Sequence, residues 1–94
     1  MKDKITKELL DKYFKITSEG LAQCKKHLDK ERLKTAKDFL DMSQRYFDDA
    51  KYFLSKEDYV LAYGALNYSH GWLDAGARIG LFKVKDSRLF TVDD

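Results

Sequence analysis

The chain has 94 residues, of which 44% are hydrophobic and 36% charged, and its formal net charge is +2. This length predicts one domain, residues 1–94, and the mean hydropathy of −0.59 is typical of a compact globular protein. So small a net charge does not indicate a nucleic acid or an anionic membrane as partner. Because Cys24 is the single cysteine, an internal disulfide and a thiolate metal site are excluded, and we expect a cytoplasmic protein.

The pattern of uncharged residues argues against a membrane partner. The N-terminal stretch lacks the continuous apolar core of a signal peptide. The longest uncharged run, residues 59–73, is shorter than the ~20 residues that a membrane span needs. Proline is absent, so long uninterrupted helices are allowed.

The first helix is predicted at approximately residues 3–28, where apolar residues follow a spacing of three and four. Gly20 lies inside this helix and weakens it by about 1 kcal/mol relative to Ala, so we expect a close contact or a bend there. Two adjacent stripes carry the pattern: Leu10, Thr17, Leu21, Cys24 and Leu28, and beside them Ile5, Leu9, Tyr13, Ile16 and Gly20.

The second helix is predicted at approximately residues 31–56, with Asp29 as its N-cap. It carries a heptad pattern and a second apolar stripe, which indicates that it contacts two neighbouring helices. The heptad residues are Leu33, Ala36, Leu40, Ser43, Phe47, Ala50 and Leu54, and the second stripe is Phe39, Met42, Tyr46 and Phe53.

The third helix is predicted at approximately residues 58–80, capped by Ser55 or Asp58 and ended by Gly80 in a Schellman motif. At 100° per residue its apolar residues form a wide arc of two rows. One row is Ala62, Leu66, Ser69, Leu73, Gly76 and Gly80, and the other is Leu61, Ala65, Tyr68, Trp72 and Ile79. We expect Tyr68 and Trp72 to belong to the core rather than to stack on a nucleotide base.

Residues 81–94 are too short for another long helix, and their apolar side chains need cover. We expect an extended tail laid across the bundle, with a short strand in "RLFTV", or a tail that pairs with a partner chain. The fold predicted is therefore all-α: an antiparallel three-helix bundle, up-down-up, with a short extended C-terminal tail.

A polar stripe opposes the apolar arc of the third helix. Its basic residue is Arg78 and its acidic residue is Asp74, and neither Lys nor Glu occurs between residues 59 and 80. Such an outer face is unusual. Either the tail covers it, a second chain covers it, or it is a recognition surface. The polar stripe consists of Tyr63, Asn67, His70, Gly71, Asp74 and Arg78.

An Asp one turn from a His is the minimal unit of a general base, and His70 and Asp74 have this spacing. Cys24 is on another helix and Ser69 points towards the core, so no nucleophile completes the unit and we predict no catalytic residues and no enzyme. His27 lies near the end of the first helix, about 15 Å from His70, which argues against a metal site. The structural alternative is that Asp74 pairs with Arg78 and His70 bonds to the tail or a neighbouring helix.

The segment "YFDDAKYFLSKEDYVLAYGALNYSHGWLDAGARIGLF" resembles the short archaeal family called domain of unknown function 357. The resemblance is strong over residues 46–82 and weak over the first helix. Ser69 stands where members commonly carry Ala. The resemblance implies a compact helical domain without an assigned activity. The residues that match the family pattern are His70, Gly71, Trp72, Asp74, Gly76 and Gly80.

Two functions remain open at this point. The preferred one is a non-enzymatic module for protein interaction or oligomerisation that uses the polar stripe and the tail, with self-association as a homodimer as its nearest form. The alternative is an accessory domain that binds a small molecule or nucleotide around His70, Gly71, Asp74 and Arg78. No cofactor and no metal are predicted. The alternative predicts a concave pocket beside Gly71.

Overall fold

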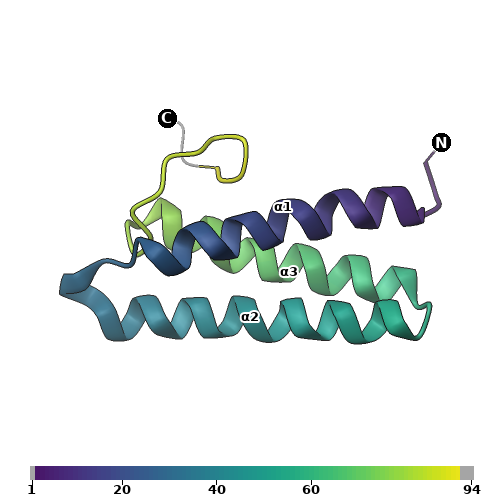
Figure 1. Cartoon of the computed structure of the whole chain (residues 1–94), viewed down its shortest axis with the longest axis horizontal. Coiled ribbons are helices and arrows are strands. Elements are labelled where there is room, and N and C mark those ends of the chain that lie inside the picture. The colour runs from purple at the N-terminus through teal and green to yellow at the C-terminus, as the bar shows by residue number, and fades with distance from the viewer. Residues whose placement is uncertain (1, 92–94) are drawn as a thin grey trace.

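The computed structural model describes residues 2–91, which form three long helices and one 3₁₀ turn. Helix α1 spans Lys7–Lys26, the 3₁₀ turn η1 spans Lys30–Arg32, α2 spans Leu33–Ser55 and α3 spans Tyr59–Arg78. The helices run antiparallel along the long axis of a body measuring 42 × 26 × 16 Å (Figure 1). The predicted all-α three-helix bundle is confirmed.

Local hydrogen bonds explain where the helices begin. Thr6 caps α1 by accepting from the Leu9 N–H at 3.1 Å, so α1 starts later than the predicted residue 3. Asp29 caps η1 rather than α2, by accepting from the Glu31 N–H at 3.1 Å. Of the two caps considered for α3, Asp58 is the one used, with its carboxylate accepting from the Leu61 N–H at 3.1 Å.

The C-terminus of α3 has the predicted Schellman geometry. Gly80 has a φ of +77°, which favours glycine, and its N–H donates to the carbonyl of Ala77 at 3.2 Å. The Leu81 N–H donates to the carbonyl of Gly76 at 2.8 Å. This turn directs the chain back over the bundle.

Helices α2 and α3 approach closely because small residues line their contact. Ser43 and Ser69 are both fully buried, and each hydroxyl donates to the backbone carbonyl of the other residue, at 2.9 and 2.7 Å. The reciprocal bonds satisfy both buried hydroxyls. Other fully or nearly fully buried residues on these two helices are Ala36, Ala50, Ala62, Leu66 and Leu73.

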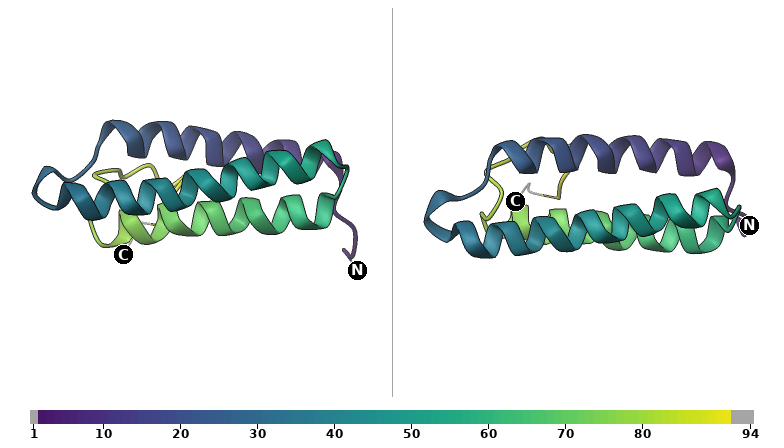
Figure 2. Two further views of the ribbon diagram at one scale, coloured as in Figure 1. Left: turned by 90° about the horizontal axis from the view of Figure 1, so that it is seen from below. Right: turned by 60° about the horizontal axis from the view of Figure 1, so that its bottom comes forward.

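The tail, residues 79–91, lies against α1 and α3 near the end where α3 finishes (Figures 1 and 2). It forms one isolated antiparallel bridge, between Leu28 and Phe82, instead of the predicted strand in "RLFTV". The described part of that segment is a turn and bend in which Leu89 and Phe90 pack into the core, while Val92 lies outside the described residues. The buried tail residues are Leu81, Phe82, Val84, Leu89 and Phe90.

Tail packing also explains two glycines. A Cβ on Gly20 of α1 would stand 3.1 Å from Leu73 and 3.3 Å from Phe90, which confirms the predicted close contact. A Cβ on Gly76 of α3 would overlap the ring of Phe82. Glycine at these positions therefore makes room for side chains of the tail and α3.

Candidate functional site

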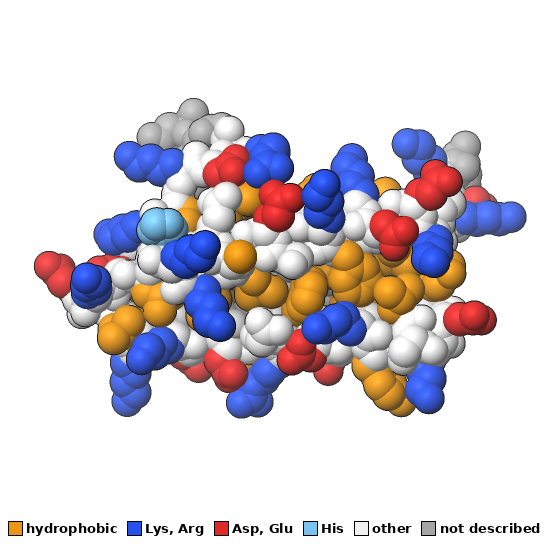
Figure 3. All heavy atoms as spheres, in the orientation of Figure 1, with side chains coloured by type: hydrophobic (Ala, Val, Ile, Leu, Met, Phe, Trp, Pro, Cys, Tyr) orange, Lys and Arg blue, Asp and Glu red, His pale blue; other side chains and the backbone are white. Residues whose placement is uncertain are grey.

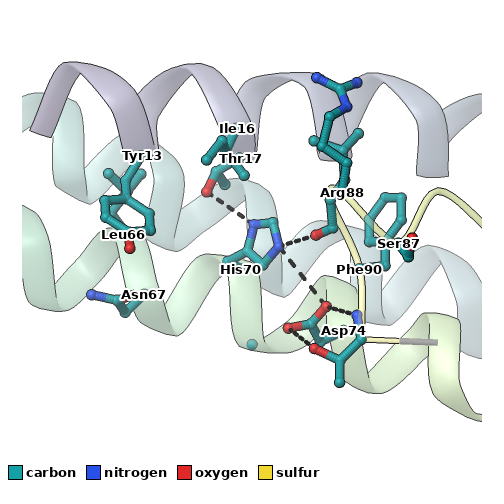
Figure 4. A pocket seen from close by; sticks show the side chains of 13 residues that line it. Tyr13, Ile16, Thr17, Leu66, Asn67, His70, Asp74, Ser87, Arg88 and Phe90 are labelled. Atoms are coloured by element: carbon teal, nitrogen blue, oxygen red, sulfur yellow. Dashed lines mark hydrogen bonds and ion pairs between the residues drawn. The ribbon is translucent and has the colours of Figure 1, made fainter. Parts of the chain in front are cut away.

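His70 connects three elements of the structure (Figure 4). Its Nε2 contacts the backbone oxygen of Leu89 in the tail, and its Nδ1 lies 3.1 Å from the hydroxyl of Thr17 on α1. Because a carbonyl oxygen only accepts, Nε2 carries the hydrogen and Nδ1 accepts from Thr17 in the neutral ring. The ring also stacks on Phe90, with 6.2 Å between centroids. Both ring nitrogens are therefore used in holding α1, α3 and the tail together.

Asp74 holds the next residues of the tail. Its carboxylate accepts from the N–H of Thr91 at 3.0 Å and from the Thr91 hydroxyl at 3.4 Å, and lies 3.9 Å from Nε2 of His70. The structural alternative, in which His70 bonds to the tail or a neighbouring helix, thus describes its observed bonds. Asp74 bonds to the tail, and Arg78 is exposed at the end of α3.

Side chains of α1 also bond to the tail. The guanidinium of Arg88 lies 3.0 Å from Glu19 and 3.3 Å from Asp86, and Gln23 donates to Asp86 at 3.2 Å. The Gln23 hydrogen bond, followed by contacts from Arg88, holds the pKa of Asp86 below its ordinary value. Short-range sequence patterns contained no signal for these bonds, since their partners are far apart in the chain.

A pocket of about 450 Å³ opens between α1, α3 and the tail (Figure 4). It lies beside Gly71, where the small-molecule alternative predicted a concavity. Arg88 of the tail lines it, whereas Arg78 does not. The other polar residues that line it include Tyr13, Thr17, Asn67, His70, Asp74, Ser87 and Thr91.

The thiol of Cys24 is inaccessible, and the described residues contain no metal-binding group. Cys24 is fully buried, and that burial, with a smaller effect of Asp74, raises the pKa of its thiol to about 12. Within residues 2–91, no three His, Cys, Asp or Glu side chains are arranged to hold a metal ion.

The exposed side of α3 differs from the predicted one. The row expected in the core is largely exposed: Leu61 is 49%, Tyr68 57% and Ile79 52% accessible, so the expectation of a core Tyr68 is wrong. The reason is that the other apolar row of α3 faces the interior of the bundle, with Ser69 against α2 and Leu73 against α1, so Tyr68 lies at the outer edge of the contact with α2. Trp72 is half-buried, with its ring edge-on to Phe39 at 5.0 Å.

We name this surface the outer face. Its helix residues are Val60, Leu61, Gly64, Asn67, Tyr68, Gly71, Ala75, Arg78 and Ile79, all exposed. By contrast, charged side chains of both signs cover the face formed by α1 and α2, with hydrophobic side chains visible between them (Figure 3).

Two hollows flank the outer face on the side of α2. One, of about 530 Å³, is lined by Phe39, Gly64, Asn67, Tyr68, Gly71, Trp72 and Ala75. The other, of about 300 Å³, is lined by Tyr46, Asp49, Phe53, Leu61, Gly64, Ala65 and Tyr68. They share Gly64 and Tyr68, so they form one groove interrupted by the Tyr68 ring, which stands 4.4 Å from the ring of Tyr46.

The glycines separate into two groups. Side-chain packing accounts for Gly20 and Gly76, and a positive φ accounts for Gly80. Gly64 and Gly71 are different, because a Cβ at either position would meet no atom within 4 Å. Each costs the helix roughly 0.5–1 kcal/mol relative to Ala, and no contact among the described residues compensates for it. Both lie in the groove of the outer face.

The architecture is that of a small all-α domain, a three-helix bundle whose C-terminal tail packs against α1 and α3. The chain belongs to the family described as protein of unknown function DUF357, whose sequence profile matches residues 12–82. No curated protein and no solved structure matches the chain. None of the helices within residues 2–91 is long and apolar enough to cross a membrane.

Proposed function

We propose that this domain is a non-enzymatic protein-interaction module whose docking surface is the outer face of α3. The observation that carries the proposal is the pair Gly64 and Gly71, two exposed helix glycines with open space above them. A helix that faces only water gains stability from Ala, Lys or Glu at such positions. Glycine there is useful when another backbone approaches closely.

The chemistry of the surrounding surface supports docking by protein. None of the exposed residues within α3 is Lys, Asp or Glu, whereas Val60 is 69% and Tyr68 57% accessible. An apolar helix laid in the groove would bury these side chains, each square ångström contributing about 25 cal/mol. Exposed aromatic residues are the type that carries most binding energy at interfaces.

The polar stripe divides into two roles under this proposal. Asn67, Gly71 and Arg78 belong to the outer face and contact the partner. His70 and Asp74 hold the tail and tie α3 to α1, which keeps the docking helix in place without touching the partner. Tyr63 supports the same side through its ring, 5.5 Å from that of Tyr13.

A comparison of matched variants tests this function. The tagged full chain is used as bait in a lysate of the source cells, as wild type, as Gly71→Glu and as Ala22→Glu. Ala22 is exposed on α1, in a hollow between α1 and α2 that shares no residue with the groove, so its variant adds the same charge away from the outer face. We expect a protein retained by wild type and Ala22→Glu and lost by Gly71→Glu, with circular dichroism confirming all three folds. Equal capture by Gly71→Glu refutes the proposal, and so does the absence of specific capture if the chain is also monomeric.

The small-molecule alternative keeps one observation in its favour, the pocket beside Gly71. Arg88, rather than Arg78, would meet an anionic group there. However, the polar groups of His70, Asp74 and Arg88 already bond within the chain, so a ligand must compete with them. A metabolite present at a hundredfold excess over its Kd would stabilise the fold by about 2.7 kcal/mol, which a thermal-shift screen detects.

A further inference from the structure

We infer that the partner docked on the outer face is a second copy of this chain, with the two α3 helices antiparallel about a two-fold axis. This inference rests on the proposed function and names its partner. The axis passes between Asn67 and Tyr68, the middle of the outer face. Two identical chains form a closed pair only through a patch that complements itself.

The central stripe of the outer face has this property, because similar residues follow at equal steps on both sides of its middle, while Leu61 and Ile79 lie at the edge, outside this repeat. In an antiparallel pair centred between Asn67 and Tyr68, equal steps outwards bring opposite residues together. Gly64 then lies opposite Gly71 of the second copy and Val60 opposite Ala75. Glu57 lies in the turn before α3, outside the helical repeat, at the end that meets Arg78 of the second copy. All of these residues are exposed: Glu57, Val60, Gly64, Asn67, Tyr68, Gly71, Ala75 and Arg78.

Each pair of opposing residues has a physical role. Gly64 opposite Gly71 allows the two backbones to approach on both sides of the axis, where open space surrounds each glycine. Tyr68 stands beside the axis and fills the groove of the other copy. This places both projection and hollow on one surface, as an isologous interface requires.

Charge selects the antiparallel arrangement. Glu57 lies just before the Asp58 cap, at one end of the outer face, and Arg78 lies in the last turn of α3, at the other end. An antiparallel pair brings Glu57 of each copy near Arg78 of the other, twice per dimer. A parallel pair would bring like charges together, which is unfavourable.

Cysteine cross-linking tests the geometry. Cys24 is fully buried, so an introduced exposed thiol reacts alone. We expect Asn67→Cys, beside the axis, to form an intermolecular disulfide under mild oxidation. Val60→Cys lies about 22 Å from its own copy in this arrangement, well beyond the ~7 Å limit between Cα atoms, and forms no disulfide with itself. A mixture of Val60→Cys and Ala75→Cys chains cross-links as a heterodimer.

Charge-reversal variants test the same contact through the molecular mass of the assembly. In sedimentation equilibrium, wild type is expected at twice the 11.0 kDa of one chain, and Gly71→Glu at 11.0 kDa. Glu57→Arg and Arg78→Glu each weaken the dimer roughly fivefold, since two surface pairs change sign. The double variant Glu57→Arg/Arg78→Glu regains the wild-type Kd.

The outcomes separate this inference from the function on which it rests. A monomer at millimolar concentration, a self-linked Val60→Cys or a dimer insensitive to Gly71→Glu overturns the inference. If the chain is monomeric and another protein is captured by wild type but not by Gly71→Glu, the docking function stands and its partner is a different protein. If it is monomeric and captures nothing, both proposals fail.

Discussion

The same substitution at two glycines of α3 should have opposite effects on stability. At Gly71 a new methyl group meets no atom within 4 Å, so Gly71→Ala gains the helix propensity of Ala, roughly 0.5–1 kcal/mol. At Gly76 the methyl group would overlap the ring of Phe82, which is 1% exposed. Overpacking of this kind costs about 1–3 kcal/mol, and expelling the ring from the core loses a similar amount.

We therefore expect Gly71→Ala to raise the free energy of unfolding by roughly 0.5–1 kcal/mol and Gly76→Ala to lower it by about 1–2 kcal/mol. In a domain of this size each kcal/mol shifts Tm by about 4–8 °C, so the two variants melt well apart.

The assay is urea and thermal unfolding followed by far-ultraviolet circular dichroism, at a concentration low enough to keep the chains monomeric. Gly64→Ala serves as the second open position and should behave like Gly71→Ala. A destabilised monomer with Gly71→Ala, or an unchanged one with Gly76→Ala, would refute the account of these glycines.

Three further predictions concern the tail, the buried thiol and pH. Asp74→Ala removes the carboxylate that accepts hydrogen bonds from the N–H and the hydroxyl of Thr91. Amide exchange at Thr91 should therefore accelerate and the free energy of unfolding fall by about 0.5–1.5 kcal/mol, whereas the exposed control Asp38→Ala should change neither. Unchanged exchange argues against the contact. Because burial raises the pKa of Cys24 to about 12, a thiol reagent at mildly alkaline pH should react only after unfolding, and rapid native reaction would contradict this. Hydrogen bonding by Arg32 lowers the pKa of Asp29. The ionised Asp29 therefore stabilises the fold fully above the ordinary carboxyl pKa, and this contribution is lost as pH falls through the lowered pKa. The difference in free energy of unfolding between wild type and Asp29→Asn should shrink on acidification, as urea titrations at several pH values would show.

Features governed by near neighbours in the chain could be predicted from sequence. The Asp58 cap and the Gly80 ending each depend on hydrogen bonds spanning three to five residues, and both are found as predicted. The start of α1 at Lys7 departs from the predicted residue 3 because the Thr6 cap was not recognised. The heptad of α2 correctly predicted Ala36, Ser43 and Ala50 as buried, whereas Leu33 at its start is exposed.

The contacts of the tail could not be predicted in this way. His70 meets Thr17 and Leu89, residues separated from it by 53 and 19 positions. Periodicity places His70 on a helix face, but only the path of the tail determines what it bonds. For the same reason Arg88 was not recognised as a residue lining the pocket.

Sequence alone determined the number of helices, their antiparallel order, two of their caps and the presence of a third helix without Lys or Glu. Those properties follow from local spacing and from the need to bury apolar stripes. The tertiary structure decided which apolar row of α3 is buried. The row that contains Ala62, Ser69 and Leu73 faces the interior, while Tyr68, at the edge of the contact with α2, remains exposed. The choice depends on close packing of small residues across two helices, and on the tail that covers His70, neither of which local periodicity encodes.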